Sequence, residues 1–196
     1  MIKIIKNIPN VTKTLVLLSI VFYLLNAYDG NININFGMYQ LNNENFNWYQ
    51  VLTFSFCHKA NPFHLLNNIA FFILISSQLE MLIGYKLINL ILLTIMINLI
   101  GVNLIPLDGN VLGLSSIVYS TMIYFLLSKN NLELSLNFGL KFVFLLFILQ
   151  NFIVLLLGVS NNTYNSDFYS EYLHFLGLIS GLLLFLFYKT KKLIKR

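Results

Sequence analysis

The sequence predicts an all-α membrane protein, a bundle of six transmembrane helices. Of its 196 residues, 58% are hydrophobic and only 10% are charged, whereas soluble domains average about 25% charged residues. A helix needs roughly 17 to 25 apolar residues to cross the hydrocarbon core, and polar, Gly or Pro breaks divide the chain into such segments. We place the six segments at 12–28, 63–83, 86–105, 113–128, 139–158 and 171–188. No stretch is left for a soluble domain, so residues 1–196 are predicted to form one membrane domain.

The basic residues predict that both termini are cytoplasmic. Eleven of the twelve Lys and Arg lie near the start of the first segment, after the sixth, or near the connections between the second and third and between the fourth and fifth segments. In a six-helix topology all of these positions are on the same side of the membrane. Only Lys59 falls on the other side. Basic residues collect in cytoplasmic loops, where they are attracted to anionic lipid headgroups. The net charge of +5 therefore needs no nucleic-acid partner to explain it. We expect a multi-pass protein of the plasma membrane.

The region between the first and second segments, residues 29–62, is too aromatic for a freely solvated loop. It contains seven aromatic side chains, among them Trp48 and Tyr49, together with Met38. Trp and Tyr favour the headgroup level, where a ring and a polar edge are both accommodated. We therefore expect this loop to lie at the membrane interface and to pack on the helices.

The second segment carries polar side chains at membrane depth. Pro62 suits the first turn of a helix, where its missing N–H costs nothing. His64 and Asn68 are then one turn apart on one face. Such side chains face the bundle interior or a water-filled cavity, and hydrogen bonding between helices is the structural alternative. Glu80, near the other end, is expected to be tied to a loop on the cytoplasmic side.

The third and fourth segments differ in what they carry. The third has no ionisable side chain from 87 to 105, which argues against a transporter with charges in its core. The fourth is short and opens with Gly113, Leu114 and Ser115, so we expect it to start below the outer surface, at the bottom of a polar cavity. Tyr119 lies one turn beyond Ser115 on the same face.

The fifth segment is rich in Leu and Phe, as a lipid-facing helix would be, whereas the sixth carries His174, Gly177 and Gly181. Two glycines at this spacing let another helix approach closely. Packing against the fourth segment would hold the His174 imidazole near Ser115, inside the bilayer. Because we place Glu171 at the membrane rim, away from the inward face of His174, a Ser/His dyad is expected rather than a triad.

Taken together, these residues resemble the rhomboid intramembrane serine proteases. The resemblance runs from Trp48 to the last segment and implies a six-helix core. It also implies that Ser115 is the nucleophile and His174 the general base and acid. The residues that carry it are Trp48, His64 with Asn68, Glu80 with Gly84, Gly113-x-Ser115 with Tyr119, and His174 with Gly177 and Gly181.

The resemblance implies that His64 and Asn68 help line an oxyanion hole and that Tyr119 supports the His174 ring. Backbone N–H groups at a helix start are unpaired and sit at the positive end of its dipole. Those of Leu114 and Ser115 are therefore expected to meet the oxyanion as well.

Two positions depart from the family pattern. Ser116 stands where Gly is commonest, and Trp48 is followed by Tyr49 and Gln50 instead of Arg. Serine is small and should fit at position 116. The lack of this Arg affects how the loop is held in place more than it affects the chemistry of the site.

The resulting prediction is a serine endopeptidase that cleaves single-pass transmembrane proteins near the outer membrane face through an acyl-enzyme. No metal is expected, since three scattered histidines without matching acids are too few ligands, and cofactor motifs are absent. A lone cysteine, Cys57, excludes an intramolecular disulfide.

Two alternatives stay open. One is a catalytically inactive rhomboid-like protein that binds membrane clients, which the serine at position 116 leaves possible. The other is a small transporter or channel component, which the lack of inward charges along the third and fifth segments disfavours.

Overall fold

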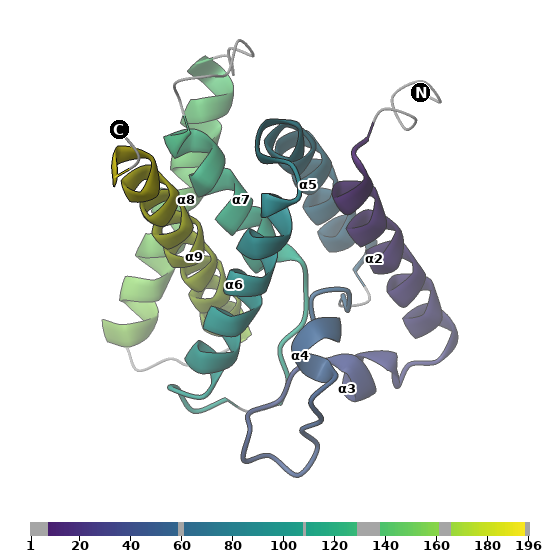
Figure 1. Cartoon of the computed structure of the whole chain (residues 1–196). Coiled ribbons are helices and arrows are strands. Elements are labelled where there is room, and N and C mark those ends of the chain that lie inside the picture. The colour runs from purple at the N-terminus through teal and green to yellow at the C-terminus, as the bar shows by residue number, and fades with distance from the viewer. Residues whose placement is uncertain (1–7, 59–60, 108, 129–137, 161–165, 195–196) are drawn as a thin grey trace.

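The computed structural model describes residues 8–58, 61–107, 109–128, 138–160 and 166–194. Within these ranges the chain forms eight helices and no strand, apart from one isolated antiparallel bridge between Met38 and Val111. This confirms the all-α prediction. The helices are α2 (Asn10–Tyr28), α3 (Ile32–Phe36), α4 (Gln50–Thr53), α5 (Pro62–Ile83), α6 (Lys86–Val102), α7 (Ser115–Leu127), α8 (Phe138–Ser160) and α9 (Ser166–Ile194) (Figure 1).

Four of the described helices, α2, α5, α8 and α9, are long and apolar enough to cross a membrane. The helices α6 and α7 are apolar but shorter, with 17 and 13 residues. Each of the six predicted segments overlaps one of these helices, and α9 extends beyond its predicted segment at both ends. The chain is therefore an integral membrane protein built as a helical bundle.

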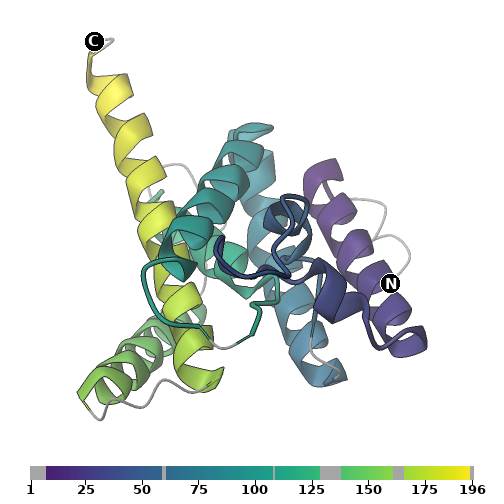
Figure 2. The same cartoon turned by 90° about the horizontal axis from the view of Figure 1, so that it is seen from below.

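The helix α7 lies inside the bundle and contacts α5, α6 and α9. Most of its side chains are buried, although α7 is the shortest of the six apolar helices. The helices α2 and α8 lie on opposite sides of the bundle (Figures 1 and 2). Most of the described α8 side chains are exposed, as expected for a helix that faces lipid.

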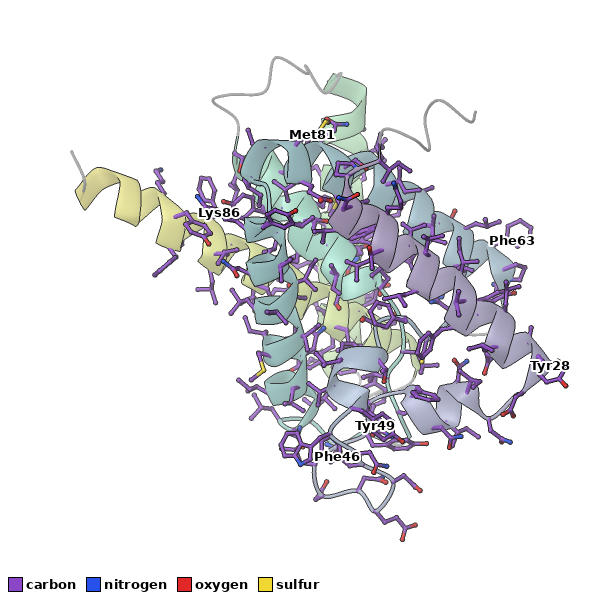
Figure 3. The ribbon with its side chains drawn as sticks, turned by 45° about the vertical axis from the view of Figure 1, so that its right-hand side comes forward. Tyr28, Phe46, Tyr49, Phe63, Met81 and Lys86 are labelled. Carbon is purple, nitrogen blue, oxygen red and sulfur yellow. The ribbon has the colours of Figure 1, made fainter. Side chains whose placement is uncertain are left out.

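The start of α2 and the end of α9 lie at the same end of the bundle, together with the α5 to α6 turn (Figure 1). Lys86 marks this end in Figure 3, and Tyr28, Phe46 and Tyr49 mark the opposite end. Among the charged residues of the topology argument, Lys3, Lys6, Lys59, Asp108, Lys129, Lys195 and Arg196 lie outside the described residues, as do the side chains of Lys141, Asp167, Lys191 and Lys192.

The aromatic loop between α2 and α5 packs on the bundle through a few buried side chains. Met38 and Phe54 are fully buried, whereas Trp48 remains 72% exposed and stacks edge-on against Phe46. Gln50 is also buried: its Nε2 donates to the Asn35 and Asn45 carbonyl oxygens at 3.1 and 3.0 Å. Gln50 thus holds together a loop that lacks the expected Arg.

Glu80 joins α5 to α2. Its carboxylate accepts hydrogen bonds from the Val11 and Thr12 amides at 2.9 and 2.8 Å, and from the Thr12 hydroxyl at 2.8 Å. First-turn amides lack partners within their own helix, and Pro9 at the N-cap of α2 offers no side-chain acceptor. The partner of Glu80 is therefore the first turn of a helix, and not a loop as the sequence suggested.

The helices α7 and α9 approach each other at two glycines. A Cβ atom placed on Gly177 would collide with the Ser116 carbonyl oxygen, and one on Gly181 would collide with the Ser120 carbonyl oxygen. Backbone atoms cannot move aside as a flexible side chain can. These two positions therefore set the distance between the two helices.

We predict that Gly177→Ala destabilises the fold by about 1 to 3 kcal/mol, because the added methyl group forces α9 away from α7. The measurement is the free energy of unfolding in detergent micelles. Gly30→Ala is the matched control, since a Cβ there meets nothing within 4 Å. Equal stability of the two variants would contradict the close approach.

Candidate active site

The proposed nucleophile, Ser115, is the first residue of α7 and is buried. Gly113 precedes it with a φ of 116°, a backbone conformation that favours glycine, and its N–H donates to the Phe54 carbonyl oxygen at 2.9 Å. A Cβ on Gly113 would lie 3.7 Å from His64 Cε1 and 3.9 Å from Ser115 Oγ. The His64 ring and the Ser115 hydroxyl therefore both lie beside Gly113.

The start of α5 positions His64 and Asn68. Pro62 occupies the first turn, as predicted, and the Asn61 side chain caps the helix by accepting from the Phe63 amide at 3.0 Å. Asn68 is buried, and its Nδ2 lies 3.4 Å from His64 Nε2. This polar pair thus faces the start of α7 from a neighbouring helix.

The His174 ring lies flat against Tyr119. The ring centroids are 4.4 Å apart and the planes differ by 14°. The Tyr119 hydroxyl accepts a hydrogen bond from Asn151 Nδ2 on α8 at 2.7 Å. Within the described residues, His174 Nε2 is buried without a hydrogen-bond partner. One ring nitrogen therefore has no bond that a proton transfer would first have to break.

The expectation that no acid lies near His174 is wrong. Glu171 Oε2 lies 3.0 Å from His174 Nδ1, close enough for a hydrogen bond or an ion pair. The two residues are three apart on α9, a spacing that places side chains on one face. A residue at the rim of the membrane can still reach one helical turn along its own helix.

Ser115 and His174 lie on facing sides of α7 and α9, without a direct bond. Ser115 shares a helix face with Tyr119, and Tyr119 stacks on His174. No hydrogen bond joins the Ser115 hydroxyl to His174 within the described part of the chain. Catalytic hydrogen bonds are often long in the absence of substrate, so the arrangement remains compatible with proton transfer.

Ser116, where the family usually has Gly, is buried and receives a hydrogen bond from Asn98 Nδ2 on α6 at 2.7 Å. One turn before Asn98 on α6 and one turn after Ser116 on α7, Thr94 Oγ1 donates to Ser120 Oγ at 2.8 Å. The extra hydroxyl at position 116 therefore has a partner and does not crowd the contact with α9.

Sequence reasoning missed Glu171, Asn151 and Asn98 as parts of this region. Asn98 and Asn151 were detectable as amide side chains within otherwise apolar segments, which normally face the bundle interior. Their partners were not detectable, because each lies on another helix.

His58 forms a second buried polar position beside the site. Its Nδ1 lies 3.0 Å from the Phe56 carbonyl oxygen, and its ring centroid lies 5.6 Å from that of His64. Burial, assisted by the nearby His64, lowers the pKa of His58 to about 4 against the opposing effect of the Phe56 carbonyl. His58 is therefore neutral at pH 7 and donates to Phe56 through Nδ1–H.

In the part of the chain that the structure describes, no three His, Cys, Asp or Glu side chains gather as a metal site would require. Burial also raises the pKa of the Cys57 thiol to about 12. Since the thiolate is the reactive form of cysteine, Cys57 is not a competing nucleophile.

Comparison with known proteins gives one family match. Residues 45–191 match the family model described as the Rhomboid domain. The match begins in the aromatic loop and extends into α9, so it contains every proposed site residue. No curated protein was found to match the chain.

We predict that acid destabilises the protein through His58. Between its ordinary pKa of 6.5 and its folded-state pKa of about 4, the unfolded chain binds the proton more readily, so stability falls as the pH drops through this window. The full effect is about 3 kcal/mol in unfolding free energy. His58→Gln should flatten this pH dependence, measured as unfolding free energy against pH in detergent. An unchanged slope in His58→Gln would contradict the assignment.

A double-mutant cycle tests the Asn98 and Ser116 contact. We predict a coupling energy of about 0.5 to 2 kcal/mol between Asn98→Leu and Ser116→Ala, because each substitution removes the other residue's partner. The readout is unfolding free energy in detergent. Asn98→Leu combined with Ser19→Ala, on α2, is the control and should be additive; a zero coupling for Asn98 and Ser116 would show that the hydroxyl has no stabilising partner.

Proposed function

The chain belongs to the rhomboid family, and we propose that it acts as an intramembrane serine endopeptidase with Ser115 as nucleophile and His174 as general base. The single observation that carries the proposal is the position of the His174 ring. It is stacked on Tyr119 of α7, the helix that begins with Ser115, and its Nε2 has no partner within the described residues. A serine hydroxyl needs such a base nearby to become a nucleophile.

In the proposed reaction the Ser115 hydroxyl attacks the scissile carbonyl carbon while its proton moves to His174 Nε2. His174 then returns this proton to the leaving amine, and the peptide bond breaks to give an acyl-enzyme on Ser115. Water, deprotonated by His174, attacks the acyl carbon and releases the second product. Ser115 regains its proton and the cycle closes.

The oxyanion would be stabilised where α7 begins. The first-turn amides of a helix have no intrahelical acceptor and carry the positive end of the dipole, so the N–H groups of Leu114 and Ser115 suit this role. The His64 and Asn68 side chains approach the same place, since His64 lies beside Gly113. A single donor of this kind typically contributes about 100- to 1,000-fold in turnover.

The proposed topology has six spans, with α6 and α7 crossing as short helices and both termini in the cytoplasm of a plasma-membrane protein. It is supported by the common position of the α2 start and the α9 end (Figure 1). The Ser115 end of α7 is tied to the aromatic loop through Gly113 and Phe54, at the opposite end of the bundle. The site would then open toward the outer face.

The proposed substrates are single-pass membrane proteins. A helix buries its carbonyl groups in hydrogen bonds to the residue four positions on, so cleavage requires local unwinding. Small or helix-breaking residues near the outer membrane face would permit this unwinding.

The alternative is an inactive rhomboid-like protein that binds membrane clients. The observation that favours it is the lack of a Ser115 to His174 hydrogen bond within the described residues. The burial and bonding of Ser116 weigh against it, because the serine at this position is accommodated.

A fluorophosphonate probe distinguishes the two functions. We predict covalent labelling of the wild type, abolished in Ser115→Ala and reduced at least about 100-fold in His174→Ala, because serine attack on phosphorus needs a general base. Cleavage of a transmembrane substrate in detergent should follow the same order. Ser128→Ala, at the other end of α7, is the control and should label normally. A wild type that neither labels nor cleaves would favour the client-binding protein.

A further inference from the structure

The carboxylate of Glu171 has no part in the reaction as described above, although it lies 3.0 Å from the general base. We propose that Glu171 is a positioning residue that fixes the tautomer and orientation of His174, so that the working site is a Ser115, His174 and Glu171 arrangement. This inference rests on the proposed protease function and deepens it.

The two ring nitrogens of His174 have different roles in this arrangement. Glu171 Oε2 lies 3.0 Å from Nδ1, and an ionised carboxylate can only accept a hydrogen bond. The proton of a neutral imidazole is therefore held on Nδ1. The lone pair is left on Nε2, the nitrogen that has no partner in the described part of the chain. That is the form needed to accept the serine proton.

The ring is held in two independent ways. Tyr119 sets the plane of the ring by stacking at 4.4 Å, and Asn151 fixes Tyr119 through its hydroxyl. Stacking alone would still allow the ring to flip by 180° about the Cβ–Cγ bond, which puts Cδ2 in the place of Nδ1 and Cε1 in the place of Nε2. The Glu171 contact removes this freedom because it engages Nδ1 alone.

The charge of Glu171 also matches the charge that forms during the reaction. When His174 takes the serine proton it becomes an imidazolium, and a carboxylate at hydrogen-bond distance stabilises that cation. Glu171 is the sole carboxylate within ion-pair distance of His174 among the described residues. From α7, the titratable group that faces the ring is the Tyr119 phenol.

The magnitude should be smaller than in a fully buried triad. The His174 and Glu171 side chains retain 12% and 17% exposure, so water partly screens their interaction. Replacing the buried acid of a serine-protease triad lowers turnover about 10,000-fold. For Glu171 we expect a loss on the order of 10- to 100-fold, because part of the stabilisation is shared with solvent.

A surface ion pair that only stabilises the helix is the competing explanation. It would contribute about 0 to 1 kcal/mol to stability and would leave both the tautomer and the reactivity of His174 unchanged. The test must therefore measure the tautomer and the reactivity directly.

The experiment uses the full chain in detergent micelles with ¹⁵N-labelled histidine. The His174 signals are assigned by their loss in His174→Gln. The ¹⁵N shifts then report the tautomer, and the rate of fluorophosphonate labelling at Ser115 reports reactivity. The variants are Glu171→Ala, the near-isosteric Glu171→Gln in case the alanine variant does not fold, and Glu171→Asp as the conservative replacement. Glu44→Ala, at an exposed acid in the aromatic loop, is the matched control.

We expect Glu171→Ala to label about 10- to 100-fold more slowly and to shift His174 toward the Nε2–H tautomer. Glu171→Gln should fall between Glu171→Ala and the wild type, and Glu171→Asp should recover part of the rate. Wild-type labelling in the folded Glu171→Ala and Glu171→Gln variants would overturn the proposal, whatever the tautomer. So would an Nε2–H tautomer in the wild type.

These outcomes separate the two proposals. If the wild type does not label at all, the protease function fails, while the ¹⁵N shifts still decide whether Glu171 holds the proton on Nδ1. If the wild type labels and Ser115→Ala does not, the protease function stands even where the Glu171 variants behave as the wild type.

Discussion

The close approach of α7 and α9 is the constraint on which the site depends. Only a residue without a Cβ fits at positions 177 and 181, because the Ser116 and Ser120 carbonyl oxygens occupy that space. At this separation His174, one turn before Gly177, reaches the Tyr119 ring and stacks on it. A wider separation would leave the imidazole without its stacking partner, and the proposed nucleophile Ser115 without its proposed base. The packing of α7 on α9 and the geometry of the proposed site therefore depend on the same contact.

Polar side chains in an apolar bundle locate its helices relative to one another. An unpaired polar group inside a membrane costs several kcal/mol, and several of these side chains find partners on a neighbouring helix. Glu80 binds the first turn of α2, Asn98 binds Ser116, and Asn151 binds Tyr119. His174 Nε2 is among the buried polar atoms without a partner in the described residues, which leaves this nitrogen able to accept a proton.

The two departures from the family pattern are each compensated locally. The hydroxyl of Ser116 points to α6, where Asn98 meets it, and the backbone of the same residue still faces Gly177. In the aromatic loop Gln50 binds the backbone at 35 and 45 from a buried position. Ser116 and Gln50 are both uncharged, so they make hydrogen bonds without the cost of burying an ion.

The sequence by itself determined the all-helical membrane class, the positions of six apolar helices and the family, because hydrophobic runs and residue order are local properties of the chain. It also singled out His64, Asn68, Ser115 and His174, since polar residues are conspicuous in apolar segments. Only the tertiary structure decided the partners: Glu171 on His174, Asn98 on Ser116 and Asn151 on Tyr119. The physical reason is that a hydrogen bond depends on how helices rotate and how closely they pack, and side chains on several helices fix both together.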